Sequence, residues 1–317
     1  MSGSSRSILV TGGCGFIGSH LVDAFVERGW EVGIFDNLST GTESNLRAGS
    51  RVRFHKGDVR DFDAVRKAMT GYKVVSHQAA LVSVARSVDD PLVSNAVNVG
   101  GTLNVLTAAR ELGVERVIYA SSSSVYGETE ILPKVETMKT NPASPYAASK
   151  LAAENYCRTF ASAYGLRTVS LRYFNVYGPR QRGGPYSGVV PAFVGAVLAG
   201  KPPVINGDGS QTRDFTYVQD AAQANVLCVE REVKPGEVFN VASASQTSIL
   251  ELAKLVAEVG GKRGQVLEFR EERKGDVRHS YADISKISSA VGYKPRYPLK
   301  LGLNEVFNWM KMQTGNV

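Results

Sequence analysis

The chain has 317 residues, of which 43% are hydrophobic and 21% charged, so its composition is that of a globular protein and excludes a disordered or collagen-like chain. Its formal net charge is +7, but basic and acidic residues are interleaved, which argues against a nucleic-acid binder. No segment has the length and apolarity of a membrane span or signal peptide, and Cys14, Cys157 and Cys228 are far apart, so we expect a cytoplasmic protein without membrane, disulfide or metal site.

Short β-branched runs alternate with helical patterns in the first half of the chain. The expected strands are residues 8–10, 31–35, 74–76, 117–121 and 168–171, and the expected helices are residues 19–28, 61–69, 93–112 and 146–164. This alternation predicts the α/β class, with a doubly wound parallel sheet covered by helices on both faces. Such sheets bind ligands at the carboxyl ends of their strands.

The pattern changes after Asn175, where glycine and proline crowd residues 178–185 and 201–203. We therefore expect a nucleotide-binding domain over residues 1–180 and a smaller α+β substrate domain over residues 181–317. Residues 236–241 resemble a strand, so a strand near 236–243 is expected to join the first domain's sheet.

A glycine-rich turn follows the first expected strand. Gly12, Gly15 and Gly18 are spaced as G-x-x-G-x-x-G, and Gly13 with the last two also gives G-x-G-x-x-G. Glycines at such a turn allow the backbone to approach a pyrophosphate at the N-terminus of the following helix. Taken alone, the spacing fits an ordinary strand–helix turn about equally well.

Polar or small residues end the next strands as well. Asp36 ends the second strand, where a carboxylate accepts hydrogen bonds from the adenosine ribose and repels a 2′-phosphate, which favours NAD over NADP. Asp58 follows a third strand candidate and is a candidate partner of the adenine amino group, and Gln78 begins a small-residue stretch at a fourth strand end. Turn and helix-cap roles are the alternatives for Asp36 and Asp58.

Tyr146 and Lys150 lie one helical turn apart, after a Ser144-Pro145 helix start. A nearby ammonium group and the positive nicotinamide ring both favour a phenolate, so we expect the pKa of Tyr146 to fall from its usual ~10 and the phenol to act as a general base. The serines at 121–124 close a strand at the same sheet edge, where a hydroxyl can relay the proton. Each motif alone fits a surface pair or a turn, but their joint order favours catalysis.

Over essentially its whole length the chain resembles the extended short-chain dehydrogenase/reductase superfamily, and within it the UDP-hexose 4-epimerases. The resemblance rests on residues 11–20, 36–41, 77–80, 120–127, 146–150, 172–175, 207–215 and 273–276. It implies a Rossmann-type domain, NAD as cofactor, a UDP-sugar substrate and a homodimer that pairs helices 93–112 and 146–164. The apolar faces of these helices are equally compatible with a place in the core.

The resemblance also implies functional residues. The catalytic residues are expected to be Ser122, Tyr146 and Lys150. Besides Tyr146 and Lys150, the cofactor is expected to contact Gly12, Gly15, Phe16, Ile17, Gly18, Asp36, Asn37, Ser39, Thr40, Gly41, Asp58, Val59, Gln78, Ala79, Ala80, Tyr173 and Val176. Besides Ser122 and Tyr146, the UDP-sugar is expected to contact Ser83, Ser123, Ser124, Asn175, Gly188, Val189, Asn206, Arg213, Arg273, Asp276 and Ser280.

Ser280 bears on the choice of substrate, because the resemblance places a wall of the sugar pocket four residues after Asp276. A serine leaves room for an N-acetyl group, so we expect a permissive 4-epimerase of UDP-N-acetylglucosamine, UDP-glucose or both. Val82, beside Ser83, stands where glucose-specific relatives carry a lysine, which implies a weaker hold on NAD. The alternatives are a UDP-glucuronate 4-epimerase and a non-catalytic nucleotide-sensing protein of the same fold.

Overall fold

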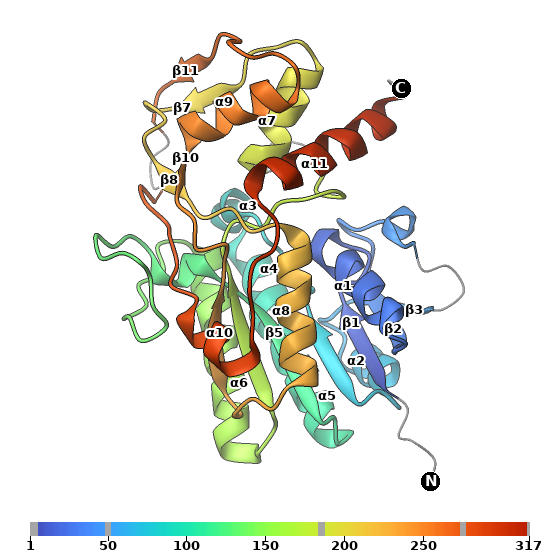
Figure 1. Cartoon of the computed structure of the whole chain (residues 1–317). Helices are drawn as coiled ribbons and strands as arrows, with labels where there is room; N and C mark the ends of the chain where they lie inside the picture. Colours follow the sequence, from blue (N-terminus) through green and yellow to red (C-terminus); the bar gives the residue numbers. More distant parts are fainter. Residues whose placement is uncertain (1–5, 48–51, 183–187, 273–276, 316–317) are drawn as a thin grey trace.

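The computed structural model describes residues 6–47, 52–182, 188–272 and 277–315 (Figure 1). Its centre is a seven-stranded sheet in the order β3-β2-β1-β4-β5-β6-β9, in which every neighbouring pair is parallel. The strands are β1 (Ser7–Thr11), β2 (Glu31–Asp36), β3 (Val52–Lys56), β4 (Val74–His77), β5 (Arg116–Ser122), β6 (Thr168–Tyr173) and β9 (Glu237–Val241). The strand order reverses between β1 and β4, which is the switch point where doubly wound sheets bind ligands.

The expected doubly wound α/β fold is confirmed. All residues of β1, β4 and β6 are buried, as apolar runs covered on both faces require. On one face, α1 (Phe16–Glu27) and α8 (Val218–Glu230) pack on the sheet, and on the other face lie α2 (Phe62–Met69), α5 (Gly101–Glu111) and α6 (Pro145–Tyr164). The strand expected at residues 236–241 is β9, at the edge of this sheet beside β6.

The helix expected at residues 93–112 is present, but it contains a π-helical turn and begins earlier, after a break at Asp90. Helices α3 (Val84–Asp89) and α4 (Pro91–Asn95) lead into a π-helical turn, η3 (Ala96–Gly100), which continues as α5. Asp90 and Pro91 explain the break before α4, because the aspartate accepts a hydrogen bond from the Val93 N–H and proline suits a first helical position. None of the helices in the described parts of the chain combines the length and apolarity needed to cross a membrane.

A smaller layer lies over the carboxyl ends of the strands (Figure 1). It contains α7 (Val189–Leu198), α9 (Ile249–Val259) and α11 (Leu299–Thr314) around an apolar core that also receives Phe16 and Ile17 of α1. Two short strand pairs complete it, namely β7 (Val204–Asn206) with β11 (Glu268–Arg270) and β8 (Thr212–Arg213) with β10 (Thr247–Ser248). The chain passes between the two layers more than once, since α8, β9 and α10 (Ser285–Val291) return to the sheet layer.

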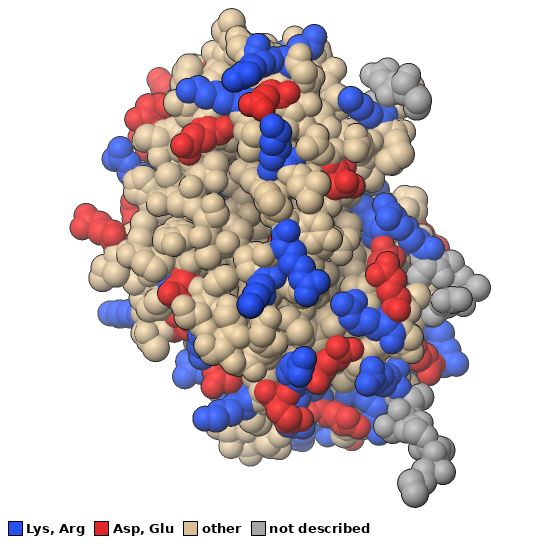
Figure 2. Space-filling view, in the orientation of Figure 1, with Lys and Arg blue, Asp and Glu red and all other residues tan. Residues whose placement is uncertain are grey.

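Charged side chains of both signs are interspersed over the face of the molecule that Figure 2 shows. Elsewhere in the described chain, oppositely charged side chains also form exposed ion pairs, such as Arg53–Glu31, Lys73–Glu115 and Lys300–Glu258. The interleaving that is evident along the sequence is therefore also present on this surface.

Candidate active site

The glycine-rich turn between β1 and α1 is packed too closely to accept side chains. Gly12 has a φ of +68°, and a Cβ there would lie 2.8 Å from the backbone nitrogen of Ala79, at the end of β4. A Cβ on Gly18 would overlap the carbonyl oxygen of Gly12. Helix α1 begins after Gly15 without a side-chain cap, so the N–H groups of its first turn, from Phe16 onward, are available to an anion. This cradle fits the pyrophosphate of a dinucleotide.

Asp36 braces the same turn. Its Oδ2 accepts a hydrogen bond from the N–H of Cys14 (2.9 Å) and its Oδ1 accepts one from the N–H of Leu38 (2.8 Å). A Cβ on Gly41 would meet the Cys14 carbonyl carbon at 2.6 Å, so the predicted Asn37–Gly41 segment returns to the turn. Asp36 therefore has a structural role, and its remaining lone pairs are those that a ribose hydroxyl would reach.

Asp58 lies just beyond β3, but it is already engaged. Arg60 donates to it from Nε (2.9 Å) and Nη2 (2.8 Å), and Asn37 donates from Nδ2 (2.9 Å). These hydrogen bonds hold the pKa of Asp58 well below its usual range. Val59 turns inward and packs against Gly101. The structure thus places the Asp58–Val59 pair at the expected strand end, with the carboxylate bound to its own neighbours.

Gln78 and Tyr173, at the ends of β4 and β6, belong to one buried network. The Tyr173 hydroxyl donates to Oε1 of Gln78 (3.3 Å) and accepts from Nδ2 of Asn225 (2.7 Å). Gln78 in turn donates from Nε2 to Oδ1 of Asn225 (3.3 Å). Asn225 comes from α8, and nothing in its local sequence marks it as part of a site. The network therefore joins the ends of β4 and β6 to α8.

A second residue that the sequence did not indicate is Asn98, in the π-helical turn η3. Its amide binds both backbone groups of Leu81, with Oδ1 accepting from N–H (2.8 Å) and Nδ2 donating to C=O (3.1 Å). Nδ2 also donates to the hydroxyl of Ser149 (2.9 Å). Leu81 follows the predicted Gln78–Ala80 segment, and Ser149 precedes Lys150. Asn98 therefore ties the expected cofactor loop to α6, and π-turns often occur at functional sites.

Ser122, Tyr146 and Lys150 come together at the carboxyl end of β5. Ser144 caps α6 by accepting from the Ala147 N–H (3.1 Å), which sets Tyr146 and Lys150 on one face. The Ser122 hydroxyl lies near the Tyr146 phenol and acts to lower its pKa. It also accepts from the hydroxyl (2.9 Å) and the N–H (3.2 Å) of Ser124, so its own hydroxyl proton remains available for donation. Ser123 follows it in the 3-10 turn η4 (Ser123–Tyr126).

Burial changes the ionisation of this group. Burial raises the pKa of Tyr146, and the hydrogen bond from Ser122 offsets only part of that rise. Burial also lowers the pKa of Lys150 to about 7. The Lys150 ammonium donates to the carbonyl of Ala120 (2.8 Å) and lies over the ring of Tyr119. In the protein without NAD, the loss of hydration therefore dominates. The expected fall in the phenol's pKa, which also depends on the positive nicotinamide ring, stays a prediction.

Other predicted substrate contacts follow β6 or lie in the smaller layer. Asn175, beyond β6, has a φ of +26°, which is rare for a residue other than glycine. Gly188 precedes α7 without a side-chain cap, which leaves the first N–H groups of the helix, from Val189 onward, available. Arg213 donates from Nη1 to the carbonyls of Thr212 (2.8 Å) and Arg278 (3.2 Å), and the N–H of the buried Ser280 donates to Thr212 (3.1 Å).

Three other predicted residues have simpler positions. Ser83 caps α3 by accepting from the Arg86 N–H (3.2 Å), and Asn206 ends β7 with its carbonyl bound by Gln211 (2.7 Å). Val176 is half-buried and packs against the cores of both layers. Arg273 and Asp276 lie outside the described residues.

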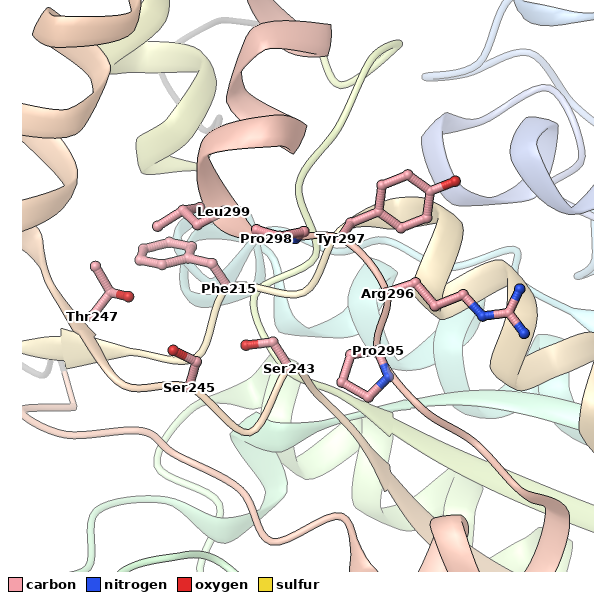
Figure 3. Close-up of a pocket in the computed structure, with 9 residues that line it drawn as sticks. All are labelled: Phe215, Ser243, Ser245, Thr247, Pro295, Arg296, Tyr297, Pro298 and Leu299. Carbon is pink, nitrogen blue, oxygen red and sulfur yellow. The ribbon is translucent and has the colours of Figure 1, made fainter.

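A cavity of about 380 Å³ is separate from these residues. It lies between the loop after β9 and the segment before α11, and its lining comprises Phe215, Ser243, Ser245, Thr247 and residues 295–299 (Figure 3). Arg296 and Tyr297 extend away from the serines in this view. The hydroxyl of Ser243 donates to the buried Asp214 (2.6 Å), so part of the polar wall is internally satisfied. None of the predicted site residues lines this cavity.

A glycine cradle lies at the switch point, a serine ends β5, and a tyrosine and a lysine of α6 lie beside that serine. Together they define a nicotinamide-dinucleotide enzyme of the Rossmann type. The family model described as "NAD dependent epimerase/dehydratase family" matches residues 8–242. The chain belongs to this family, and NAD is its cofactor.

Individual relatives extend over nearly the whole chain. It is 39% identical over 309 residues to a UDP-glucose 4-epimerase of Mycolicibacterium smegmatis, covering 96% of this chain and 98% of that protein. A solved UDP-N-acetylglucosamine 4-epimerase from Methanobrevibacter ruminantium, in complex with UDP-N-acetylmuramic acid, matches with a TM-score of 0.93 and 40% identity over 98% and 99% of the two chains. A UDP-glucuronic acid 4-epimerase from Bacillus cereus, with a substrate analogue and NAD, matches with a TM-score of 0.90 and 33% identity over 97% and 99%.

Proposed function

We propose that this protein is a UDP-sugar 4-epimerase that inverts C4 of UDP-N-acetylglucosamine and also accepts UDP-glucose. The observation that carries the proposal is the cluster of Ser122, Tyr146 and Lys150 beside the glycine cradle, in a chain of this family. Relatives named as UDP-glucose and UDP-N-acetylglucosamine 4-epimerases support the UDP-sugar class. The choice among hexoses rests on Ser280 alone.

In this proposal the chain's own residues manage the proton at the sugar's C4 oxygen. Bound NAD supplies a hydride acceptor and, in the reverse step, a hydride donor. Tyr146 takes the hydroxyl proton at its phenolic oxygen and returns it after the sugar has presented its other face. Ser122 donates its free hydroxyl proton toward the phenolic oxygen of Tyr146 and so stabilises the negative charge on the phenolate. Lys150 fixes the helix against the end of β5 through Ala120.

Because burial raises the pKa of Tyr146, the phenol is expected to become a base only after the cofactor has bound. Without cofactor, the phenol keeps its proton, because Ser122 compensates only part of the lost hydration of a phenolate. With NAD held beside it, Tyr146 would lie near a positive charge that favours the phenolate, the form that removes the sugar's proton. Tyr146 would therefore be a stronger base in the NAD-bound protein than in the protein alone.

The anionic part of the substrate is handled by the smaller layer. The α7 N-terminus at Gly188 offers backbone donors, and Arg213 offers a planar fork that suits a diphosphate. These groups belong to different elements from the Ser122–Tyr146–Lys150 cluster. The sugar ring can thus turn over at the catalytic cluster while the nucleotide remains held.

The function is tested by incubating the purified protein with UDP-N-acetylglucosamine, UDP-glucose and UDP-glucuronate, with the C4 epimers read by NMR. We expect turnover of the first two sugars. Turnover of UDP-glucuronate alone would favour the second candidate, which the Bacillus cereus relative supports. Binding of UDP-sugars without any turnover would instead indicate a nucleotide-sensing protein.

Ser280→Tyr is expected to narrow the range of substrates. The side chain of Ser280 is small and buried, so a phenol ring there would fill space that we assign to the N-acetyl group. Turnover of UDP-N-acetylglucosamine should fall roughly 10- to 100-fold relative to that of UDP-glucose, as steric exclusion from a pocket allows. The measurement is the ratio of the two kcat/KM values. Ser280→Thr is the matched control, and an unchanged ratio in Ser280→Tyr would remove Ser280 from the pocket wall.

We also propose a homodimer, with α4 and α6 at its two-fold axis. Leu92 of α4 is 81% exposed, Val88 of α3 is 62% exposed and Tyr156 of α6 is 38% exposed, and these helices lie side by side. An exposed apolar face of this kind suits an isologous contact with a second copy. Leu92→Asp is expected to give a monomer by sedimentation, whereas Leu301→Asp, on the exposed side of α11, should leave the dimer intact. A Leu92→Asp protein that sediments as a dimer would place the interface elsewhere.

A further inference from the structure

A buried carboxylate lies behind the catalytic cluster and has no part in the mechanism above. It belongs to Glu154 of α6, whose side chain is 1% exposed. Arg172 of β6 donates to it from Nη2 (2.6 Å) and Nε (3.0 Å), and Ser121 of β5 donates its hydroxyl (2.6 Å). One carboxylate therefore joins a helix to two neighbouring strands.

Each of the three joined residues is next to a residue of the candidate site. The register of β5 and β6 pairs Ser121 with Arg172 and, one position further, Ser122 with Tyr173. Glu154 is four residues after Lys150 and eight after Tyr146, so all three lie on one face of α6. Lys150 is itself bound to the carbonyl that precedes Ser121. The contacts of Glu154 thus reach both sides of the catalytic cluster.

Stability alone does not explain a pair of ions at this position. Apolar residues of similar volume commonly hold such a helix at least as well as a buried ion pair, which loses its hydration. The Nη1 atom of Arg172 makes no hydrogen bond, and the guanidinium lies 4.6 Å from the ring of Tyr126. The ion pair instead fixes the orientation of α6 relative to β6, because a guanidinium fork and a carboxylate bind each other in one planar geometry.

We propose that Glu154 is a positioning residue for the proton transfer: through Ser121 and Arg172 it fixes the ends of β5 and β6 against α6, and so sets the place of Ser122 relative to Tyr146. This inference rests on the proposed epimerase function. It requires that Ser122 shifts relative to Tyr146 when the carboxylate is removed, while the nucleotide contacts of the smaller layer are unaffected.

The test is Glu154→Gln, which keeps the shape of the side chain but cannot accept the guanidinium fork as an anion. Under the proposal, kcat for the UDP-sugar falls roughly 10- to 100-fold, the loss that a displacement of about 1 Å can cause. KM is unchanged, because the substrate's anionic contacts are elsewhere. A deuterium label at C4 of the sugar should show a larger isotope effect on kcat than in the wild type, because transfer becomes rate-limiting.

Arg116→Gln provides the matched control. Arg116 is a buried arginine at the amino end of β5, where Nη1 donates to the carbonyls of Cys228 (2.6 Å) and Arg231 (2.6 Å). Its replacement should lower the melting temperature and leave kcat and the isotope effect unchanged. If Glu154→Gln does not fold, Glu154→Leu with Arg172→Met replaces both ions by apolar groups, and this double variant should fold and still show the reduced kcat.

Three results would overturn the proposal. The first is a wild-type kcat in a folded Glu154→Gln protein or in the double variant. The second is an equal loss of kcat in Arg116→Gln at equal destabilisation. The third is an unchanged distance between the oxygens of Ser122 and Tyr146 in crystal structures of wild type and Glu154→Gln with NAD, which needs no substrate. Absence of turnover by the wild type on all three UDP-sugars would instead defeat the proposed function, so the two failures are distinguishable.

Discussion

Tyr146→Phe is expected to lower kcat by roughly 10²- to 10⁴-fold, the range that general acid–base catalysis contributes. The variant lacks the phenolic oxygen that takes the proton from the sugar's C4 hydroxyl, and no other described side chain of α6 presents an ionisable oxygen to Ser122. The fold should be unaffected, because the Tyr146 contact that anchors the helix is its backbone N–H, which donates to the hydroxyl of Ser87 (3.0 Å). KM should change little.

The measurement is the rate of C4 epimerisation together with the melting temperature. Tyr164→Phe is the matched control, because Tyr164 lies at the far end of the same helix and is 53% exposed. It should retain the wild-type rate. Should Tyr146→Phe also retain the wild-type rate, the proton would have another acceptor and the assigned mechanism would be abandoned.

The fold could be predicted from the sequence because its signals are local. Apolar runs such as residues 8–10 and 117–121 are strands in the structure, and the glycines at 12, 15 and 18 mark the turn between β1 and α1. The serine run and the Tyr146–Lys150 pair are also local patterns, and each follows or faces a strand end. Elements defined by short-range periodicity were therefore within reach of the sequence.

The residues that support the site could not be predicted in this way. Gln78 and Asn225 are 147 positions apart, and Glu154 and Arg172 are 18 apart. Local sequence patterns therefore do not indicate that these residues contact each other. On a helix, Asn98, Glu154 and Asn225 each look like an ordinary polar surface residue, because hydrophobic periodicity records apolar positions only. Their burial becomes evident once the helices are placed on the sheet.

The effect of burial on Tyr146 could not be predicted for a related reason. The sequence shows that a lysine stands one turn away, but not that its ammonium is committed to the carbonyl of Ala120. Nor does it show how much water the phenol loses. Because desolvation is a property of the assembled cleft, the direction of the pKa shift followed from the structure and not from the motif.

Gly18→Ala is expected to abolish NAD binding at NAD concentrations that saturate the wild type. The added methyl group would overlap the carbonyl oxygen of Gly12 and approach the Gly12 carbonyl carbon to 2.8 Å, and both are backbone atoms that cannot swing aside. The turn must open, which moves the first N–H groups of α1 away from the pyrophosphate. At a concentration of 100 times the dissociation constant, NAD should stabilise the wild type by about 2.7 kcal/mol, and this gain should be absent in the variant.

Gly195→Ala, inside α7, is the control for this prediction. A Cβ there would meet only the terminal methyl of Met310 of α11, at 3.5 Å. This variant should keep the full NAD-dependent rise in melting temperature, and alanine in a helix interior should add up to about 1 kcal/mol of stability. The comparison separates a general cost of a methyl group from a cost specific to the β1–α1 turn. If Gly18→Ala gained as much stability from NAD as the wild type, the pyrophosphate would have to lie away from this turn. In that case the oxidant would not be placed beside Tyr146, and the phenol would lack the positive charge that its activation requires.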